Sequence, residues 1–133
     1  MIICNKKICL HHILLITIFL IILWGFLVKR FFKKDILLTK FCPLDGCDIW
    51  ALTHILFYFI LAYNFPSYYI LLFFIGVFFE FFETFIGITN NFIKKLSPPS
   101  SDINQPWWTG RISDVIFNTI GIIIGIYFSP YKK

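Results

Sequence analysis

Five polar side chains lie within or at the edges of the long apolar runs of this sequence. They are His54, Glu80, Glu83, Asp114 and Asn118. An ionisable group in the hydrocarbon core of a membrane costs roughly 2.5–3.5 kcal/mol on insertion scales. Apolar segments keep several such groups only where the groups satisfy one another or carry chemistry, so these five residues are the first candidates for a functional site.

These residue types favour a site for a hard divalent cation. Carboxylate and amide oxygens suit Ca²⁺ or Mg²⁺ better than zinc. Unpaired carboxylates that lie close together repel one another at low dielectric, so either protonation or a bound cation is needed. The expected ligands of Ca²⁺, with Mg²⁺ as the alternative ion, are Glu80, Glu83, Asp114 and Asn118. His54 need not be a ligand, because a neutral imidazole beside a metal is a natural general base.

The elements that must position these residues are predicted to be membrane helices. Hydrophobic residues make up 59% of the 133 residues and charged residues 14%, whereas soluble domains average about 25% charged residues. The mean hydropathy is +0.81. About 20 apolar residues cross a bilayer as a helix, which predicts one all-α, polytopic membrane domain over residues 1–133. The four expected spans cover residues 10–28, 49–63, 68–88 and 112–128. A soluble helical bundle is the alternative for any single short run, but four runs in one short chain argue against it.

Lysine and arginine residues bracket the apolar runs, which indicates membrane flanks rather than a nucleic-acid partner. Eight of them lie in segments 29–48 and 94–111, and the other four lie near the termini. The positive-inside rule then places both loops in the cytoplasm and both termini outside it. We interpret the first span as an uncleaved anchor, because its apolar stretch exceeds the ~7–15 residues of a signal peptide and no Ala-x-Ala site follows.

This orientation places all five polar residues at a similar depth in the cytoplasmic leaflet. The two glutamates are three residues apart, and the aspartate and asparagine are four apart, so each pair shares a helical face. Gly121-x-x-x-Gly125 continues the second of these faces and allows a close helix contact, either within the chain or in an oligomer. The convergence of independent patterns favours one shared polar site.

Each residue also has an ordinary structural interpretation. A histidine near a membrane interface is usually interfacial or hydrogen-bonded. The glutamates could pair with Arg111 or Lys94, Asp114 could cap the last helix, and Asn118 could hold two helices together.

The cysteines of the first predicted loop are less informative. Cys42 and Cys47 have no second ligand pair nearby, which argues against a zinc knuckle. A turn at Pro43 and Gly46 fits better, and a disulfide is disfavoured if the loop is cytoplasmic.

Several short motifs between residues 48 and 126 resemble the core of eukaryotic base-exchange phosphatidylserine synthases. The motifs are Trp50-Ala-Leu-Thr-His54, Glu80-Phe-Phe-Glu83, Trp107-Trp108, Asp114 and Asn118-Thr-Ile-Gly121. The resemblance implies a calcium-dependent transferase of phospholipid metabolism, which exchanges a lipid head group for serine. It also implies His54 as the general base and the three acidic residues as calcium ligands. Thr109 stands where that family has an acid, and an insertion at about 93–103 separates the glutamates from the tryptophans.

The last motifs also resemble VanZ-like membrane proteins, which are small and linked to glycopeptide tolerance. Arg111-Ile-Ser-Asp114, Asn118-Thr-Ile-Gly121 and Gly125 match that pattern, as does His54 with Tyr58 four residues later, whereas Glu83 stands where glutamine is expected. Three functions therefore stay open: head-group exchange on a membrane lipid, a non-catalytic VanZ-like role, and a structural membrane subunit. For the first, the expected substrate-binding residues are Tyr58, Trp107, Trp108 and Arg111.

Overall fold

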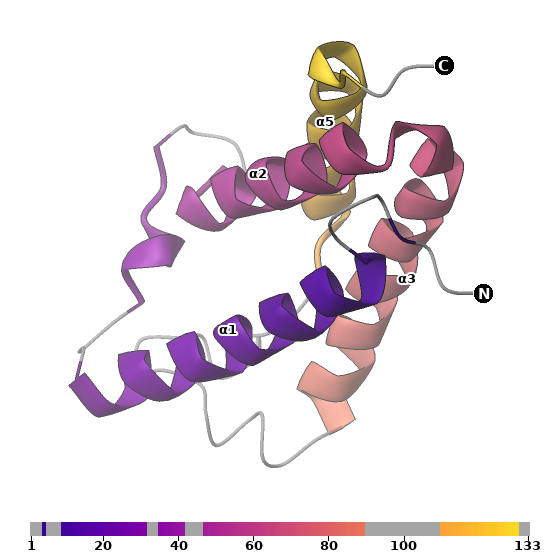
Figure 1. Cartoon of the computed structure of the whole chain (residues 1–133). Coiled ribbons are helices and arrows are strands. Elements are labelled where there is room, and N and C mark those ends of the chain that lie inside the picture. The colour runs from indigo at the N-terminus through magenta and orange to yellow at the C-terminus, as the bar shows by residue number, and fades with distance from the viewer. Residues whose placement is uncertain (1–3, 5–8, 32–34, 42–46, 90–109, 131–133) are drawn as a thin grey trace.

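The computed structural model of the chain is all-α (Figure 1). It describes residues 4, 9–31, 35–41, 47–89 and 110–130. Within these residues the α-helices are α1 (Leu10–Phe31), α2 (Ile49–Asn64), α3 (Tyr69–Thr89) and α5 (Ile112–Phe128). Two short 3-10 helices, η1 (Ile36–Leu38) and η2 (Pro66–Tyr68), precede α2 and α3. The all-α class and the four expected helices are confirmed, with ends that differ from the prediction by at most a few residues.

Two helical segments are long and apolar enough to cross a membrane. They are Leu10–Val28 and Pro66–Phe85, and only 11% and 22% of their apolar windows are buried inside the chain. Helices Ile49–Asn64 and Ile112–Phe128 are apolar but shorter. Length and composition of this kind also occur in the core helices of soluble proteins and, near an N-terminus, in signal sequences. The low burial of the two long segments sets them apart from core helices, which are mostly buried.

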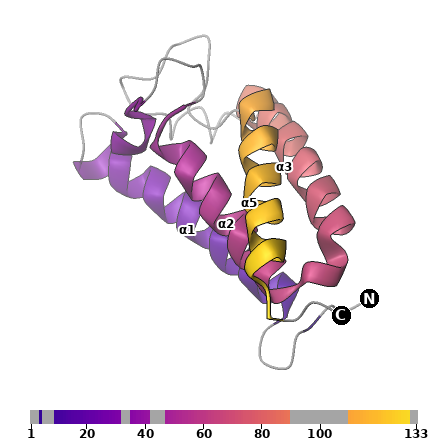
Figure 2. The same cartoon turned by 90° about the horizontal axis from the view of Figure 1, so that it is seen from above.

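Successive helices run in opposite directions, so the end of one helix lies at the same side of the molecule as the start of the next (Figure 2). At one end, the Ser129 hydroxyl that follows α5 donates a hydrogen bond to the carbonyl of Tyr63 in α2, at 2.7 Å. A cluster of buried apolar residues at the same end joins the start of α1, the end of α2 and the start of α3; it includes Leu10, Leu61, Phe65 and Leu72. The starts of α2 and α5 therefore lie at the opposite end, together with the end of α3.

Glycines bring α2 and α5 into backbone contact. A Cβ atom at Gly121 would overlap the carbonyl oxygen of Ile55, and one at Gly125 would lie 2.6 Å from the carbonyl oxygen of Phe59. Both glycines are buried. The face that we considered for an oligomer contact is thus occupied within the chain, by α2.

Helix α1 is attached to α2 through the carboxylate of Asp35. Its Oδ1 atom accepts hydrogen bonds from Trp24 Nε1 at 3.2 Å and from the backbone N–H of Leu37 at 2.9 Å. Its Oδ2 atom accepts one from Trp50 Nε1 at 3.1 Å. Because Trp24 belongs to α1 and Trp50 to α2, this buried carboxylate, hereafter the Asp35 clamp, links the two helices.

The described cysteines are disulfide-bonded. Cys4 and Cys9 form a disulfide just before α1. Cys47 is also disulfide-bonded, an arrangement that the sequence disfavoured only if this loop is cytoplasmic. The backbone bridge between Lys40 and Asp48, and the hydrogen bond from the N–H of Phe41 to the carbonyl of Cys47, bring the two ends of the loop together. Cys42, Pro43 and Gly46 lie outside the described residues.

Candidate functional site

Three of the five polar residues come together at the end where α2 and α5 begin. His54 of α2, Glu80 of α3 and Asp114 of α5 each offer one ligand atom, and these atoms all lie within 4.8 Å of one another. Glu80 and Asp114 are buried, and His54 is partly buried. We call this group the His–Glu–Asp cluster. Helices α2, α3 and α5 contribute one residue each, so the cluster depends on the packing of these three helices.

Asn118 connects two members of the cluster. Its side-chain oxygen lies 2.9 Å from Nδ1 of His54, and its Nδ2 donates to Oε1 of Glu80 at 3.2 Å. The Nδ1 atom of His54 is also 3.7 Å from Oε1 of Glu80. Asn118 is only 2% exposed. The amide therefore holds the imidazole and the carboxylate in a fixed relation, which is the interhelical role considered for it from the sequence.

Backbone contacts hold Glu80 from the side of the last loop. The N–H of Arg111 donates to Oε2 of Glu80 at 3.3 Å. A Cβ atom at Gly110 would overlap the backbone of Glu80, so only glycine fits between the loop and α3 there. The hydroxyl of Thr84 donates to the carbonyl of Glu80 at 2.9 Å and lies 3.3 Å from that of Gly110. The residues that lead into α5 are thus clamped onto α3 next to the cluster.

Asp114 does not cap α5. The N-cap position is occupied by Arg111, with no side-chain capping bond, and Asp114 follows in the first turn. Its N–H donates to the carbonyl of Arg111 at 3.0 Å, while its side chain is buried in the cluster. A carboxylate in the first turn is favoured by the helix dipole. The capping interpretation is therefore replaced by a position inside the site.

The ion pairs considered for the glutamates are arranged differently from the expectation. The guanidinium of Arg111 pairs with Asp48, with Nη1 3.1 Å from Oδ2. Asp48 also caps α2, because its Oδ1 accepts from the N–H of Ala51 at 3.2 Å. The Arg111 side chain is 41% exposed, so solvent weakens this pair. Lys94, the other partner considered, lies outside the described residues.

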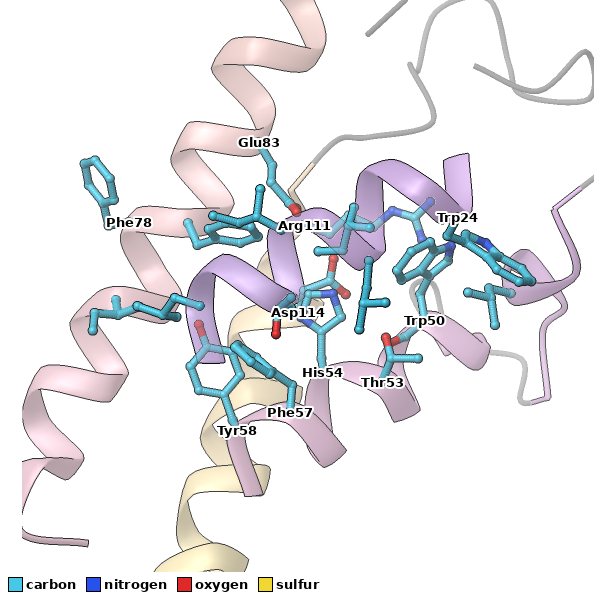
Figure 3. Close-up of a pocket in the computed structure, with 18 of the residues that line it drawn as sticks. Trp24, Trp50, Thr53, His54, Phe57, Tyr58, Phe78, Glu83, Arg111 and Asp114 are labelled. Atoms are coloured by element: carbon cyan, nitrogen blue, oxygen red, sulfur yellow. The ribbon is translucent and has the colours of Figure 1, made fainter. Parts of the chain in front are cut away.

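Glu83 is buried one turn from Glu80 and lines a cavity next to the cluster. Figure 3 shows its carboxylate pointing from α3 toward the region of Arg111 and Asp114. It is not one of the three residues whose ligand atoms lie within 4.8 Å of one another. Its expected role as a metal ligand stays a prediction.

Two members of the cluster, His54 and Asp114, line the polar end of a cavity of about 800 Å³. Apolar residues of α1, α2 and α3 form most of the wall, including Leu20, Leu23, Phe57 and Phe78. The polar end is formed by His54, Glu83, Arg111, Asp114 and Asp48. In Figure 3 the labelled residues of this end converge on one region, with Trp24 and Trp50 beside it. Such a cavity has room for a ligand with one polar and one apolar part.

The remaining predicted site residues are placed as follows. Tyr58 and Arg111 both line the cavity. Tyr58 is almost fully buried, and its hydroxyl would lie 3.2 Å from a Cβ atom at Gly76. Trp107 and Trp108 lie outside the described residues, so their expected contact with substrate stays a prediction.

Sequence reasoning missed two buried acidic residues near the site, Asp48 and Asp35. Asp48 immediately precedes the apolar run of α2, which is the signature of an N-cap, and that signal could have placed it beside the site. Asp35 precedes a short apolar run in the same way and caps η1, but an N-cap signal does not point to its two indole partners.

Comparisons with protein-family models, with curated proteins and with solved structures found no match. The resemblances to phosphatidylserine synthases and to VanZ-like proteins therefore enter the next subsection as hypotheses.

Proposed function

We propose that this chain is a four-span membrane protein that binds a divalent cation at the His–Glu–Asp cluster and exchanges the head group of a phospholipid. The observation that carries the proposal is that two members of the cluster, His54 and Asp114, line the polar end of an otherwise apolar cavity, with Glu80 beside them. A lipid presents a phosphate next to long apolar chains, so it matches both parts of such a cavity.

The surface of the described helices supports a bilayer environment. Large hydrophobic side chains are exposed along α1, α3 and α5, and they include Phe19, Phe74, Phe78, Phe81 and Ile123. Helices α2 and α5 have 16 and 17 residues, which corresponds to roughly 24–26 Å. A bilayer core of about 30 Å adapts to such lengths by local thinning.

The donor set fits a hard cation. Two buried carboxylates close together favour a positive charge between them, and Glu80 and Asp114 supply such a pair. Glu83 would add a third carboxylate oxygen from the next turn of α3. Bound there, Ca²⁺ or Mg²⁺ would neutralise the phosphate oxygens of a lipid head group. Asn118 already uses both ends of its amide in hydrogen bonds to His54 and Glu80. In this proposal it therefore orients the residues that bind the cation and is not itself a ligand.

The proposed reaction is redox-neutral. The imidazole of His54 takes the proton of an incoming alcohol, whose oxygen forms a new P–O bond with the lipid phosphorus. The P–O bond to the original head group breaks, and the departing alcohol takes the proton from His54. Arg111 and Tyr58, which line the cavity, would contact the phosphate and the bound head group. Serine as the incoming alcohol rests on the resemblance to phosphatidylserine synthases.

A purely structural role is the second candidate, and one observation favours it. Every buried polar side-chain atom in the described part of the chain has a hydrogen-bond partner. A fully satisfied polar cluster can hold helices together without any ligand. The VanZ-like alternative likewise requires no exchange activity, and the same experiment separates both from the enzyme.

The test uses the full chain reconstituted in phosphatidylcholine or phosphatidylethanolamine vesicles. Labelled serine is added with Ca²⁺, with Mg²⁺ or with a chelator, and labelled lipid is measured. We expect labelled phosphatidylserine only with a divalent cation. Absence of product in every condition, with a folded protein, would reject the enzymatic proposal and favour a structural or VanZ-like role.

Cation binding is measured separately by the shift of thermal unfolding with added Ca²⁺. We expect Glu80→Gln to lose most of the shift that the parent shows. Asp35→Asn is the matched control, because it makes the same chemical change at a buried carboxylate outside the cluster. Equal shifts in the parent and in Glu80→Gln would show that Glu80 does not hold the cation.

A further inference from the structure

The hydrogen bonds of Asn118 determine how its amide is oriented. Glu80 accepts a hydrogen bond at each carboxylate oxygen, from Asn118 Nδ2 at Oε1 and from the backbone N–H of Arg111 at Oε2. As placed, Glu80 accepts a hydrogen bond at both carboxylate oxygens, so the NH₂ end of Asn118 faces Glu80 and its carbonyl oxygen faces His54.

This orientation in turn selects the protonated nitrogen of His54. The carbonyl oxygen of Asn118 lies 2.9 Å from Nδ1 of His54 and can only accept a hydrogen bond. Nδ1 must therefore carry the proton, and in the neutral ring Nε2 then keeps its lone pair. The opposite amide orientation would need a protonated Glu80, which would donate from Oε1 to the asparagine oxygen.

We propose that Asn118 is a positioning residue, which holds neutral His54 in the Nδ1–H tautomer and leaves Nε2 as the basic atom. The assignment of Nε2 as the acceptor of the alcohol proton rests on the proposed function, whereas the tautomer does not. Nε2 would take that proton, the ring would become imidazolium with both nitrogens protonated, and Nε2 would return the proton to the departing alcohol. Nδ1 keeps its proton throughout, because Asn118 accepts its hydrogen bond.

Because the hydrogen bonds from Asn118 to His54 and Glu80 are buried, the preference of His54 for the Nδ1–H tautomer is strong. Asn118 is 2% exposed and Glu80 is 6% exposed, so water does not readily replace either hydrogen bond. An unpaired buried donor or acceptor costs more than the bond itself contributes. If the imidazole proton moved to Nε2, the lone pair of Nδ1 would face the carbonyl oxygen of Asn118. That repulsion opposes the tautomer that free histidine prefers in water.

The test is ¹⁵N NMR of the histidine ring in the full chain, in detergent micelles with a chelator and at a pH at which the ring is neutral. His11 and His12 are replaced by glutamine, so that His54 alone gives the signal; both lie at the exposed start of α1. We expect a protonated, pyrrole-type Nδ1 and an unprotonated, pyridine-type Nε2. A protonated Nε2 in this protein would overturn the proposal.

Two variants show whether Asn118 is the cause. Asn118→Asp keeps an oxygen that accepts from Nδ1, so the Nδ1–H tautomer should persist. Asn118→Leu removes the acceptor, so the ring should change to the Nε2–H tautomer. If the leucine variant folds and keeps the Nδ1–H tautomer, Asn118 does not set it. If that variant does not fold, the spectrum of the parent still decides, because a protonated Nε2 there contradicts the inference.

These measurements need neither cation nor lipid, so they separate this inference from the proposed function. A protein with the Nδ1–H tautomer but no exchange activity would refute the enzymatic role alone. A protein with the Nε2–H tautomer and full exchange activity would refute the role of Asn118 alone.

Discussion

Replacing Gly121 with alanine should separate α2 from α5 and so destabilise the bundle that holds the cluster. The added Cβ would overlap the carbonyl oxygen of Ile55 and lie 3.1 Å from both its carbonyl carbon and its Cα. All three atoms belong to the backbone of α2, which cannot yield locally without breaking helical hydrogen bonds. Gly121 lies less than one turn from Asn118, so a shift of α5 would also stretch the bond to His54.

The size of the effect follows from two opposing contributions. Overpacking of a tight contact costs about 1–3 kcal/mol, and rigid backbone on the opposing side places Gly121→Ala near 3 kcal/mol. Alanine is better than glycine in a helix by about 1 kcal/mol. The net loss in the free energy of unfolding should therefore be about 2 kcal/mol, which is roughly a 30-fold change in the folded-to-unfolded ratio.

The assay is equilibrium unfolding in mixed micelles, followed by tryptophan fluorescence. Gly76→Ala is the first comparison, because its Cβ would meet the side chains of Tyr58 and Asn118 at 3.2–3.3 Å, and side chains can move; its effect should stay within about 1 kcal/mol. Ile123→Ala, at an exposed site of α5, should change stability by about 0.5 kcal/mol or less. If Gly121→Ala is as stable as Ile123→Ala, the backbone contact between α2 and α5 is refuted.

Three further predictions concern the site and its supports. His54→Ala should lower head-group exchange by about 10²–10⁴-fold while calcium still shifts thermal unfolding, because the carboxylates remain; exchange within about threefold of the parent would remove His54 from the reaction. Gly110→Ala should weaken calcium binding without loss of helical circular dichroism, because its Cβ would displace the backbone of Glu80; an unchanged calcium titration would contradict this. Asp35→Asn should lower the free energy of unfolding by about 1.5–3 kcal/mol, because the amide NH₂ must face one of the two indole N–H donors; unchanged stability in the same unfolding assay would reject the Asp35 clamp.

The sequence was informative about the helices because their apolar runs are long and separated by polar or proline-containing segments. It was also informative about the glycine face, since Gly121 and Gly125 recur at a spacing that only close helix packing uses. The expectation that the polar residues share one site came from combining lysine and arginine positions with helical periodicity. Each of these inferences depends on a pattern that repeats along the chain.

The details that could not be predicted are those without a repeating pattern. The Asp35 clamp joins residues 11 and 15 positions away, through indole groups that any amphipathic surface could present. Asp114 was considered as a helix cap because it follows a serine, although the predicted span already begins at Ile112, as α5 does. The bridge made by Asn118 depends on distances between three helices. Helix α1 is apolar on all sides, so the sequence did not show which of its faces meets the cavity.

The clamp of Gly110 and Arg111 onto Glu80 has a consequence for variation in chain length. The chain leaves α3 at Thr89 and returns to the same helix at Gly110. The position of Gly110 is therefore fixed by its contact with α3 and not by the number of residues that precede it. Changes in chain length between residues 90 and 109 that preserve the contact of Gly110 with Glu80 should therefore leave the cluster in place. The segment at about 93–103, which interrupts the resemblance to phosphatidylserine synthases, lies between these two points in the sequence and outside the described residues.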